Sequence, residues 1–361
     1  MTFEGKITIA FPREENGRVQ VGMREAFKPE KILEGISCEE AISRIGALYS
    51  LCRTGQTQAA FTAFEQAKAV QPTGHESRIR ECLILTERLG ENLMRLAIDW
   101  PKWTGATAPK FAFPAAKVLV DAIKTIFDEE NASGSQGPKG LEPTLAQIEK
   151  FIECEILEIP LARWLSLRGN EIDSWCLNGQ QLPARAMAYV IKNRWQQIGA
   201  AQDPAPTMAA ETSTDATTVE TSLYTRWRNE KLIGSCETGP RGGLLARLLC
   251  RLVEIAKLPD LIRNTYSGDK AIETKCSLEG GCASATVQVA RGRLIHSVKL
   301  DGNIVTRYRI SSPSHVNFSP DGMAQRIFQQ IFEKNRSQLS DVANMMVRTA
   351  DPCVPYVLEG V

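Results

Sequence analysis

Hydrophobic residues recur every three or four positions through much of the first 200 residues. The clearest stretch follows a Pro-Thr-Gly turn at 72–74 and opens with Glu76 and Ser77, which suit a first helical turn. Its apolar face consists of Ile79, Leu83, Thr86, Leu89, Leu93 and Leu96. Two further faces are formed by Leu145, Ile148, Ile152 and Ile156, and by Met187, Val190, Ile191 and Trp195. The pattern predicts a mainly helical region from 39 to about 198.

Strand patterns lie toward the two ends of the chain. Residues 5–22 hold two β-branched runs, ITIAF and RVQV, around the turn-prone stretch PREENG, which predicts a strand pair. Far along the chain, VQVARGRLIHSVKL and IVTRYRIS flank an Asp-Gly turn, which predicts a β-hairpin. A basic helix is expected at about 241–257, and a last helix at about 321–346.

A polar segment divides these elements into two groups. Residues 201–222 are small, polar and proline-containing, so they cannot bury enough apolar surface to order themselves, and we expect a flexible linker. Residues 1–200 then hold the N-terminal strand pair and a helical bundle. Residues 223–361 hold a helix, the hairpin, the last helix and a tail that contains Asp-Pro-Cys. The expected fold class is α+β, with a central helical bundle and small β-containing parts near both termini.

Composition narrows the possible functions. The 43 Lys and Arg residues balance 42 Asp and Glu residues, so no overall basic field points to nucleic acid or to a membrane surface. No apolar run reaches the roughly 18 residues of a membrane-spanning helix, and the first residues lack the apolar core of a signal peptide. We therefore expect a cytoplasmic protein. Its ten cysteines are then expected to be buried side chains or metal ligands rather than disulfides.

Five short motifs follow one another along the chain. They are Phe3-Glu4-Gly5, residues 48–56 (LYSLCRTGQ), residues 237–240 (ETGP) with 245–247 (LAR), residues 290–296 (ARGRLIH) with 313–317 (PSHVN), and residues 347–353 (VRTADPC). In this order and spacing they resemble the large subunit of [NiFe] hydrogenases, whose motifs include I-E-G, C-G-x-C-x-x-x-H, P-R-G-x-L-x-H and D-P-C-x-x-C. The resemblance covers nearly the whole chain, although residues 100–220 match poorly. It implies a large-subunit-like fold.

The departures from the family pattern concern its metal ligands. An active centre in this family uses four thiolates, two from each end of the chain. Here Tyr49 and Tyr356 stand at two of these positions, Gln56 replaces the family histidine, and only Cys52 and Cys353 remain. Because nickel in a thiolate site needs more than two ligands, the resemblance implies a homologue that is not an enzyme and carries no nickel. With these departures, the chain resembles the HupK/HoxV-type accessory proteins of hydrogenase maturation.

The resemblance also implies a cargo. Proteins of this type are thought to scaffold the assembly of the Fe(CN)2CO group, which would make Cys52 and Cys353 the iron ligands. Arg291 and Ser314 would donate hydrogen bonds to the cyanides, and Pro313 would form an apolar wall for CO. The expected partners are the Hyp maturation proteins and the hydrogenase large subunit or its chaperones.

Other interpretations remain open from the sequence. The chain could be a metal-free chaperone that mimics the large subunit, or a redox enzyme such as a diverged hydrogenase or a complex I-type quinone subunit. The missing thiolates count against a hydrogenase, and the two retained cysteines count weakly against the quinone subunit. Cys276 and Cys282 flank two glycines, but a loop with two unrelated thiols is the favoured interpretation. His296 is expected to satisfy a hydrogen bond in the core, and Glu4 to lie on the surface.

Overall fold

The computed structural model describes residues 5–24, 28–49, 51–104, 112–133, 140–200, 220–237 and 239–361. The strands are β1 (Lys6–Ala10), β2 (Gln20–Arg24), β3 (Lys275–Glu279), β4 (Cys282–Val289), β5 (Gly292–Asp301), β6 (Ile304–Ser311) and β7 (Tyr356–Glu359). The helices are α1 (Pro29–Leu33), α2 (Cys38–Leu48), α3 (Arg53–Ala67), α4 (Gly74–Asp99), α5 (Pro101–Thr104), α6 (Ala112–Ser133), α7 (Leu141–Ile152), α8 (Leu161–Leu165), α9 (Asn170–Asn178), α10 (Leu182–Lys192), α11 (Leu223–Trp227), α12 (Lys231–Cys236), α13 (Leu244–Ser267), α14 (Pro313–Asn317), α15 (Met323–Lys334) and α16 (Leu339–Ala350). A π-helical turn covers Glu153–Leu157 and a 3-10 turn covers Arg336–Gln338.

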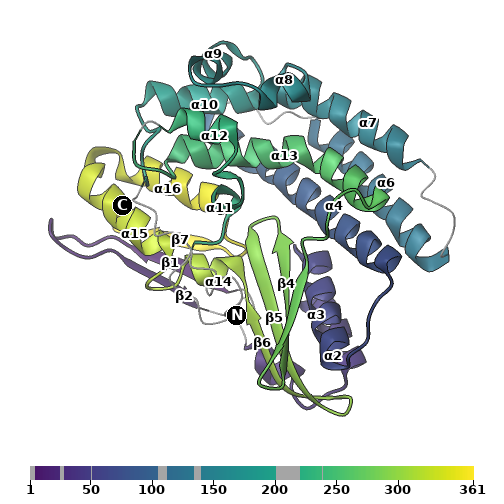
Figure 1. Cartoon of the computed structure of the whole chain (residues 1–361). Helices are drawn as coiled ribbons and strands as arrows, with labels where there is room; N and C mark the ends of the chain where they lie inside the picture. The colour runs from purple at the N-terminus through teal and green to yellow at the C-terminus, as the bar shows by residue number, and fades with distance from the viewer. Residues whose placement is uncertain are drawn as a thin grey trace.

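Helices fill the upper part of the molecule as drawn in Figure 1, and two sheets lie below them. Helix α4 begins with a capping box, in which Thr73 Oγ1 accepts the N–H of Glu76 and the Glu76 carboxylate accepts the N–H of Thr73. The apolar face predicted for this segment is buried in the main core. The other two predicted faces are also buried, apart from the half-buried Ile191. The mainly helical region is therefore confirmed.

Helix α13 crosses the centre of the molecule and packs against α4 (Figure 1). The predicted basic helix at about 241–257 is too short, because α13 continues through Pro259 to Ser267. Arg247 and Arg251 are buried rather than solvated, since apolar residues surround most of the helix, whereas Arg263 near its end is half-buried. Arg247 pairs with Glu220, and Arg251 pairs with Asp351. These ion pairs let a core helix carry charge.

The four-stranded sheet has the order β3-β4-β5-β6 and is antiparallel throughout. The predicted hairpin is confirmed as β5 and β6, joined at Gly302. However, the run VQVARGRLIHSVKL forms two strands, because the chain turns at Ala290 and Arg291 between β4 and β5. Only glycine suits position 292 after this turn, since its φ is 139° and a Cβ there would lie 2.5 Å from the backbone oxygen of Thr221. Arg291 is therefore at the tip of a tight hairpin.

The three-stranded sheet has the order β2-β1-β7. The predicted N-terminal strand pair is confirmed as β1 antiparallel to β2. Strand β7 was not predicted; it runs parallel to β1, with Ile7 opposite Tyr356. A strand of four residues with no adjoining turn gives little local signal, because only its distant partner defines it. The two ends of the chain therefore meet in one sheet (Figure 1).

The C-terminal segment differs from the predicted single helix. Helices α15 and α16 are separated by the 3-10 turn at Arg336–Gln338, so the helix expected at 321–346 is two helices. Residues 201–219 of the predicted linker lie outside the described residues. Its last residues are described, and Thr221 is buried. Residues 1–200 and 223–361 share one large hydrophobic core, which contains both Ile7 and Val347.

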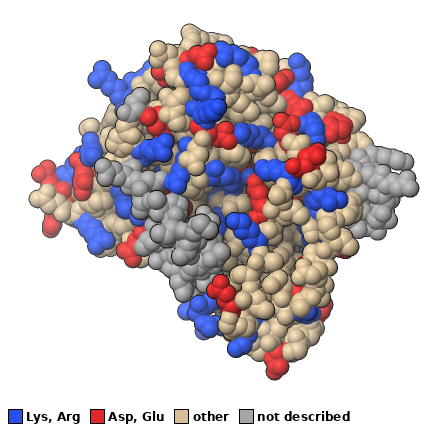
Figure 2. All heavy atoms as spheres, viewed as in Figure 1, with Lys and Arg blue, Asp and Glu red and all other residues tan. Residues whose placement is uncertain are grey.

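Basic and acidic side chains are interspersed over the face shown in Figure 2, in line with the balanced composition. In the part of the chain that the structure describes, no helix combines the length and the apolar character needed to span a membrane.

Candidate functional site

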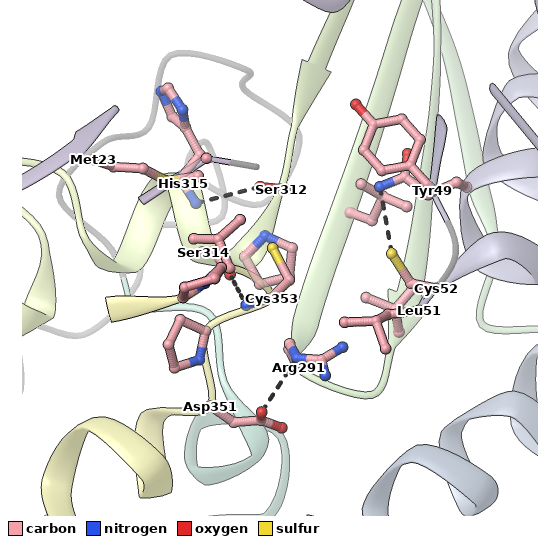
Figure 3. Close-up of a pocket in the computed structure, with 18 of the residues that line it drawn as sticks. Met23, Tyr49, Leu51, Cys52, Arg291, Ser312, Ser314, His315, Asp351 and Cys353 are labelled. Carbon is pink, nitrogen blue, oxygen red and sulfur yellow. Dashed lines mark hydrogen bonds and ion pairs between the residues drawn. The ribbon is translucent and has the colours of Figure 1, made fainter. Parts of the chain in front are cut away.

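A cavity of about 530 Å³ lies where the ends of the chain meet (Figure 3). The segments that line it include the start of α3, the β4–β5 turn, the first turn of α14 and the loop between α16 and β7, together with residues of α4 and the end of α2. All five residues that the resemblance assigned to metal and cofactor are in its wall: Cys52, Arg291, Pro313, Ser314 and Cys353. The structure thus brings together residues that are scattered along the chain, while their roles remain predictions.

Cys52 is the N-cap residue of α3 and is half-buried. The amides of the first helical turn are satisfied by another residue, because Glu87 of α4 accepts the N–H groups of Thr54 at 2.6 Å and Gly55 at 2.8 Å. The Cys52 side chain is thereby left to face the cavity. Burial, reinforced by the carboxylate of Glu91, raises the pKa of the Cys52 thiol to about 12. The thiol is protonated at neutral pH when nothing binds it.

Cys353 is held in place by its neighbours. Its backbone N–H donates to Ser314 Oγ at 3.0 Å. Two residues earlier, Asp351 ends α16 in the left-handed conformation, with a φ of 53°. That conformation is uncommon for a residue other than glycine, and it turns the chain from the helix toward the cavity. Cys353 is consequently presented from a rigid turn.

Three arginines converge on the buried carboxylate of Asp351. Arg95 Nε lies 2.8 Å from it, Arg251 Nη1 3.3 Å and Arg291 Nε 3.4 Å. Burial opposes ionisation, but the charges of Arg291, Arg251 and Arg95 outweigh it and hold the pKa of Asp351 below its usual value. The carboxylate is therefore ionised, and it fastens the C-terminal tail to α4, α13 and the β4–β5 turn.

Arg291 is almost fully buried and only partly satisfied. Its Nη1 donates to Glu91, and its Nε pairs with Asp351. Its Nη2 has no hydrogen-bond partner among the described residues. Burial raises the pKa of Glu91 to about 7, against the attraction of Arg291. A buried cationic donor without a partner is costly, so the cavity wall offers an unused donor to an acceptor or anion.

Ser314 and Pro313 form the first turn of α14. Ser312 caps this helix by accepting the N–H of His315 at 3.3 Å, and Pro313 occupies its first position. The Ser314 hydroxyl accepts from Cys353 and, like any hydroxyl, can also donate. The site therefore combines two thiols, a cationic donor, a hydroxyl and an apolar ring.

The two tyrosines at the remaining family thiolate positions also line the cavity. The Tyr356 hydroxyl donates to Asn344 Oδ1 at 3.2 Å, and the Arg348 guanidinium lies 5.9 Å from the ring centroid. Burial raises the pKa of Tyr356, so its phenol is neutral. A neutral phenol is a poor replacement for a soft thiolate.

Other residues singled out by the sequence lie elsewhere. Cys276 and Cys282 are in the β3–β4 hairpin opposite Ala285 and Glu279, so neither is paired with the other across the strands. His296 is buried and hydrogen-bonded, as expected. Glu4 lies outside the described residues. In the ranges described, no group of three or more His, Cys, Asp or Glu side chains is arranged to hold a metal ion.

Sequence reasoning missed the polar residues of α4 that support the site. Glu87, Glu91, Arg95 and Asp99 are four residues apart. Arg95 and Asp99 line the cavity, Glu91 accepts from the lining residue Arg291, and Glu87 holds the first turn of α3 next to Cys52. A charged stripe with helical spacing beside an apolar face was the available signal. Because charged stripes usually face solvent, this signal alone does not predict a site.

Comparison with known proteins extends these findings. No family model matches the chain. The hydrogenase expression/formation protein HoxV of Cupriavidus necator is 23% identical over 91% of this chain and 90% of its own length. The hydrogenase expression/formation protein HupK of Bradyrhizobium diazoefficiens is 25% identical over 86% of this chain and 84% of its own length.

Solved structures show the same architecture. The reduced Ni-Fe-Se hydrogenase from D. vulgaris Hildenborough superposes with a TM-score of 0.55 at 15% identity, covering 94% of each chain. An NAD+-reducing [NiFe]-hydrogenase gives a TM-score of 0.55 at 12% identity, covering 93% of this chain and 92% of its own. The expected α+β fold of the hydrogenase large subunit is thereby confirmed.

Proposed function

Because this chain is a HupK/HoxV-type, large-subunit-like protein, we propose that it is a scaffold in [NiFe]-hydrogenase maturation. In this proposal it carries the Fe(CN)2CO precursor and passes it to the hydrogenase large subunit. The named relatives, which are hydrogenase expression/formation proteins, support a role in maturation. The proposed donors are the Hyp maturation proteins, the proposed acceptor is the large subunit or its chaperones, and the proposed compartment is the cytoplasm.

The observation that carries the proposal is the meeting of two thiols with an unsatisfied guanidinium. Cys52 and Cys353 line one cavity, and Arg291 Nη2 has no hydrogen-bond partner among the residues that the structure describes. An iron(II) ion that brings two cyanides and one CO needs few protein ligands. Two thiolates, at iron–sulfur distances of about 2.3 Å by analogy with other metal–thiolate bonds, would hold it and leave one position open. The cargo would thus supply most of its own coordination.

Charge supports the same assignment. Iron(II) and two cyanides cancel, so binding by two thiolates gives the unit a net negative charge. Arg291 would stabilise that charge by donating from Nη2 to a cyanide nitrogen, because charge-assisted hydrogen bonds are the strong ones. Ser314 could donate to the second cyanide, and the Pro313 ring would form the apolar wall beside CO. Loading would release the two thiol protons to solvent.

The test is infrared spectroscopy of the protein after co-expression with the Hyp maturation proteins and anaerobic purification. The expected result is a set of CO and cyanide stretching bands that is lost in both Cys52→Ala and Cys353→Ala. Cys276→Ala is the matched control, since Cys276 is exposed in β3 and remote from the cavity wall, and it should keep the bands. Full-strength bands in both single variants would rule out cysteine ligation. A metal-free protein that still binds its partners would instead favour a chaperone.

A further inference from the structure

A line of hydrogen bonds runs from Tyr308 in the core to the sulfur of Cys52 in the cavity wall. Gln56 Nε2 donates to Cys52 Sγ at 3.7 Å, a length acceptable for a sulfur acceptor. Gln56 Oε1 lies 2.8 Å from His296 Nε2, and His296 Nδ1 lies 2.7 Å from the Tyr308 hydroxyl. The exposed fractions of Gln56, His296 and Tyr308 are 2%, 0% and 0%, so water does not compete for these contacts.

The chemistry of the three side chains determines the direction of every hydrogen bond. Burial lowers the pKa of His296 to about 3, so the ring is neutral and has a single N–H. An amide oxygen only accepts, so His296 must carry its proton on Nε2, the nitrogen that faces Gln56. The bare Nδ1 then accepts from the Tyr308 hydroxyl. All three donors therefore point the same way, toward Cys52.

The surrounding structure keeps these residues in place. Gln56 is one helical turn after Cys52 on α3, and its backbone N–H donates to the Cys52 carbonyl at 3.0 Å. His296 and Tyr308 project from adjacent strands β5 and β6, with their rings edge to face at 5.6 Å. Phe64, also on α3, packs against the Tyr308 ring. A rotation of any one side chain would leave a buried polar group unsatisfied.

We propose that Gln56, His296 and Tyr308 are positioning residues that hold a hydrogen-bond donor on the Cys52 sulfur. This donor orients the Cys52 sulfur toward the cavity. When Cys52 is a thiolate, the donor also withdraws negative charge from the sulfur. For the identity of the bound metal group, this inference rests on the proposed function. The donor on the sulfur exists without the cargo, so it can be tested in the metal-free protein.

The effect on the cargo follows from electron donation. Outer hydrogen bonds to metal ligands tune the metal, and those to sulfur lower the charge that the sulfur donates. Without the donor, the iron would receive more electron density from Cys52. It would then donate more electron density back to CO. Back-donation weakens the C–O bond, so its stretching band would move to lower wavenumber. A purely structural role for Gln56 would not shift this band in a defined direction.

The spectroscopic test compares Gln56→Met with Gln58→Met in protein loaded by co-expression. Methionine matches glutamine in length but has no N–H donor. Gln58 is on the same helix and outside the wall of the cavity, so it is a matched control. We expect the CO band of Gln56→Met to move to lower wavenumber and that of Gln58→Met to stay. Tyr308→Phe, a milder change, should shift the band in the same direction by less. An unmoved band in Gln56→Met overturns the inference.

A second measurement needs no iron. The rate of iodoacetamide alkylation at one pH, followed by peptide mass spectrometry, reports the thiolate reactivity of Cys52, with Cys353 as the internal reference. We expect the Cys52 rate to fall several-fold relative to Cys353 in Gln56→Met and to stay unchanged in Gln58→Met. If wild-type protein shows no iron bands but this rate falls, the inference stands and the iron-carrier proposal fails. If the bands are present and neither readout changes, the inference fails alone.

Discussion

The carboxylate of Asp351 lies 2.8 Å from Nε of Arg95, which joins the residue before Pro352-Cys353 to helix α4. Arg251 and Arg291 share the same carboxylate. A single buried side chain therefore connects the C-terminal tail to three other parts of the fold. The arrangement of Cys353 depends on this ion cluster as much as on its own contacts.

Replacement of Asp351 should loosen the tail and destabilise the protein. Asp351→Asn leaves the buried guanidinium groups of Arg251 and Arg291, and the half-buried one of Arg95, without their shared anion. Breaking buried pairs in this way typically costs about 3–5 kcal/mol. Urea denaturation should show this loss, and limited proteolysis should cut the tail faster than in wild type. Asp341→Asn, in the exposed first turn of α16, is the control and should change neither measurement. Equal stability of the two variants would contradict the described cluster.

Arg291→Lys tests the unused donor of the cavity. Lysine keeps the charge but loses the planar fork that reaches Glu91, Asp351 and the cavity at once. We expect iron-loaded protein to show lower occupancy and shifted cyanide bands in the infrared spectrum. Arg307→Lys, on an exposed position of β6, should leave both unchanged. Unaltered cyanide bands in Arg291→Lys would remove Arg291 from the proposed site.

The buried His296 makes a testable contribution to acid sensitivity. Its pKa is lowered to about 3 in the folded protein, against about 6.5 in an unfolded chain. Below pH 6.5 the unfolded state binds a proton that the folded state does not, so stability falls as pH falls from 6.5 toward 3. The slope from one such group is about 1.4 kcal/mol per pH unit.

Urea titrations between pH 7 and pH 4 can measure this slope. The free energy of unfolding should fall less steeply with decreasing pH in His296→Gln than in wild type, because glutamine does not titrate. Identical slopes in wild type and His296→Gln would show that His296 is not the neutral, buried group described above.

Metal content distinguishes a scaffold from a hydrogenase. With Tyr49 and Tyr356 at two thiolate positions, we expect iron but no stoichiometric nickel after co-expression with the maturation proteins, and no hydrogen uptake. Elemental analysis and a hydrogen-uptake assay provide the measurement. About one nickel per chain together with activity would refute the scaffold proposal.

Local patterns predicted the mainly helical region, the individual helices α4, α7 and α10, and the two hairpins that contain strong turn signals. The apolar face of α4 and its capping residues are readable from neighbouring positions, because helix formation depends on contacts three and four residues apart. The same reasoning failed for α13 and the α15–α16 break. In α13 tertiary burial extends the helix through Pro259, and between α15 and α16 a short turn interrupts a continuous helical pattern.

The sequence by itself singled out Cys52, Arg291, Pro313, Ser314 and Cys353, through the order of its motifs and the two cysteines that remain. Tertiary structure alone decided how they meet. Strand β7 pairs with β1, and Asp351 contacts three arginines from distant segments. His296, on a distant strand, contacts the Gln56 amide that donates to Cys52. Each of these relationships joins residues far apart in sequence. Their geometry depends on the packing of the whole core rather than on the preferences of neighbouring residues.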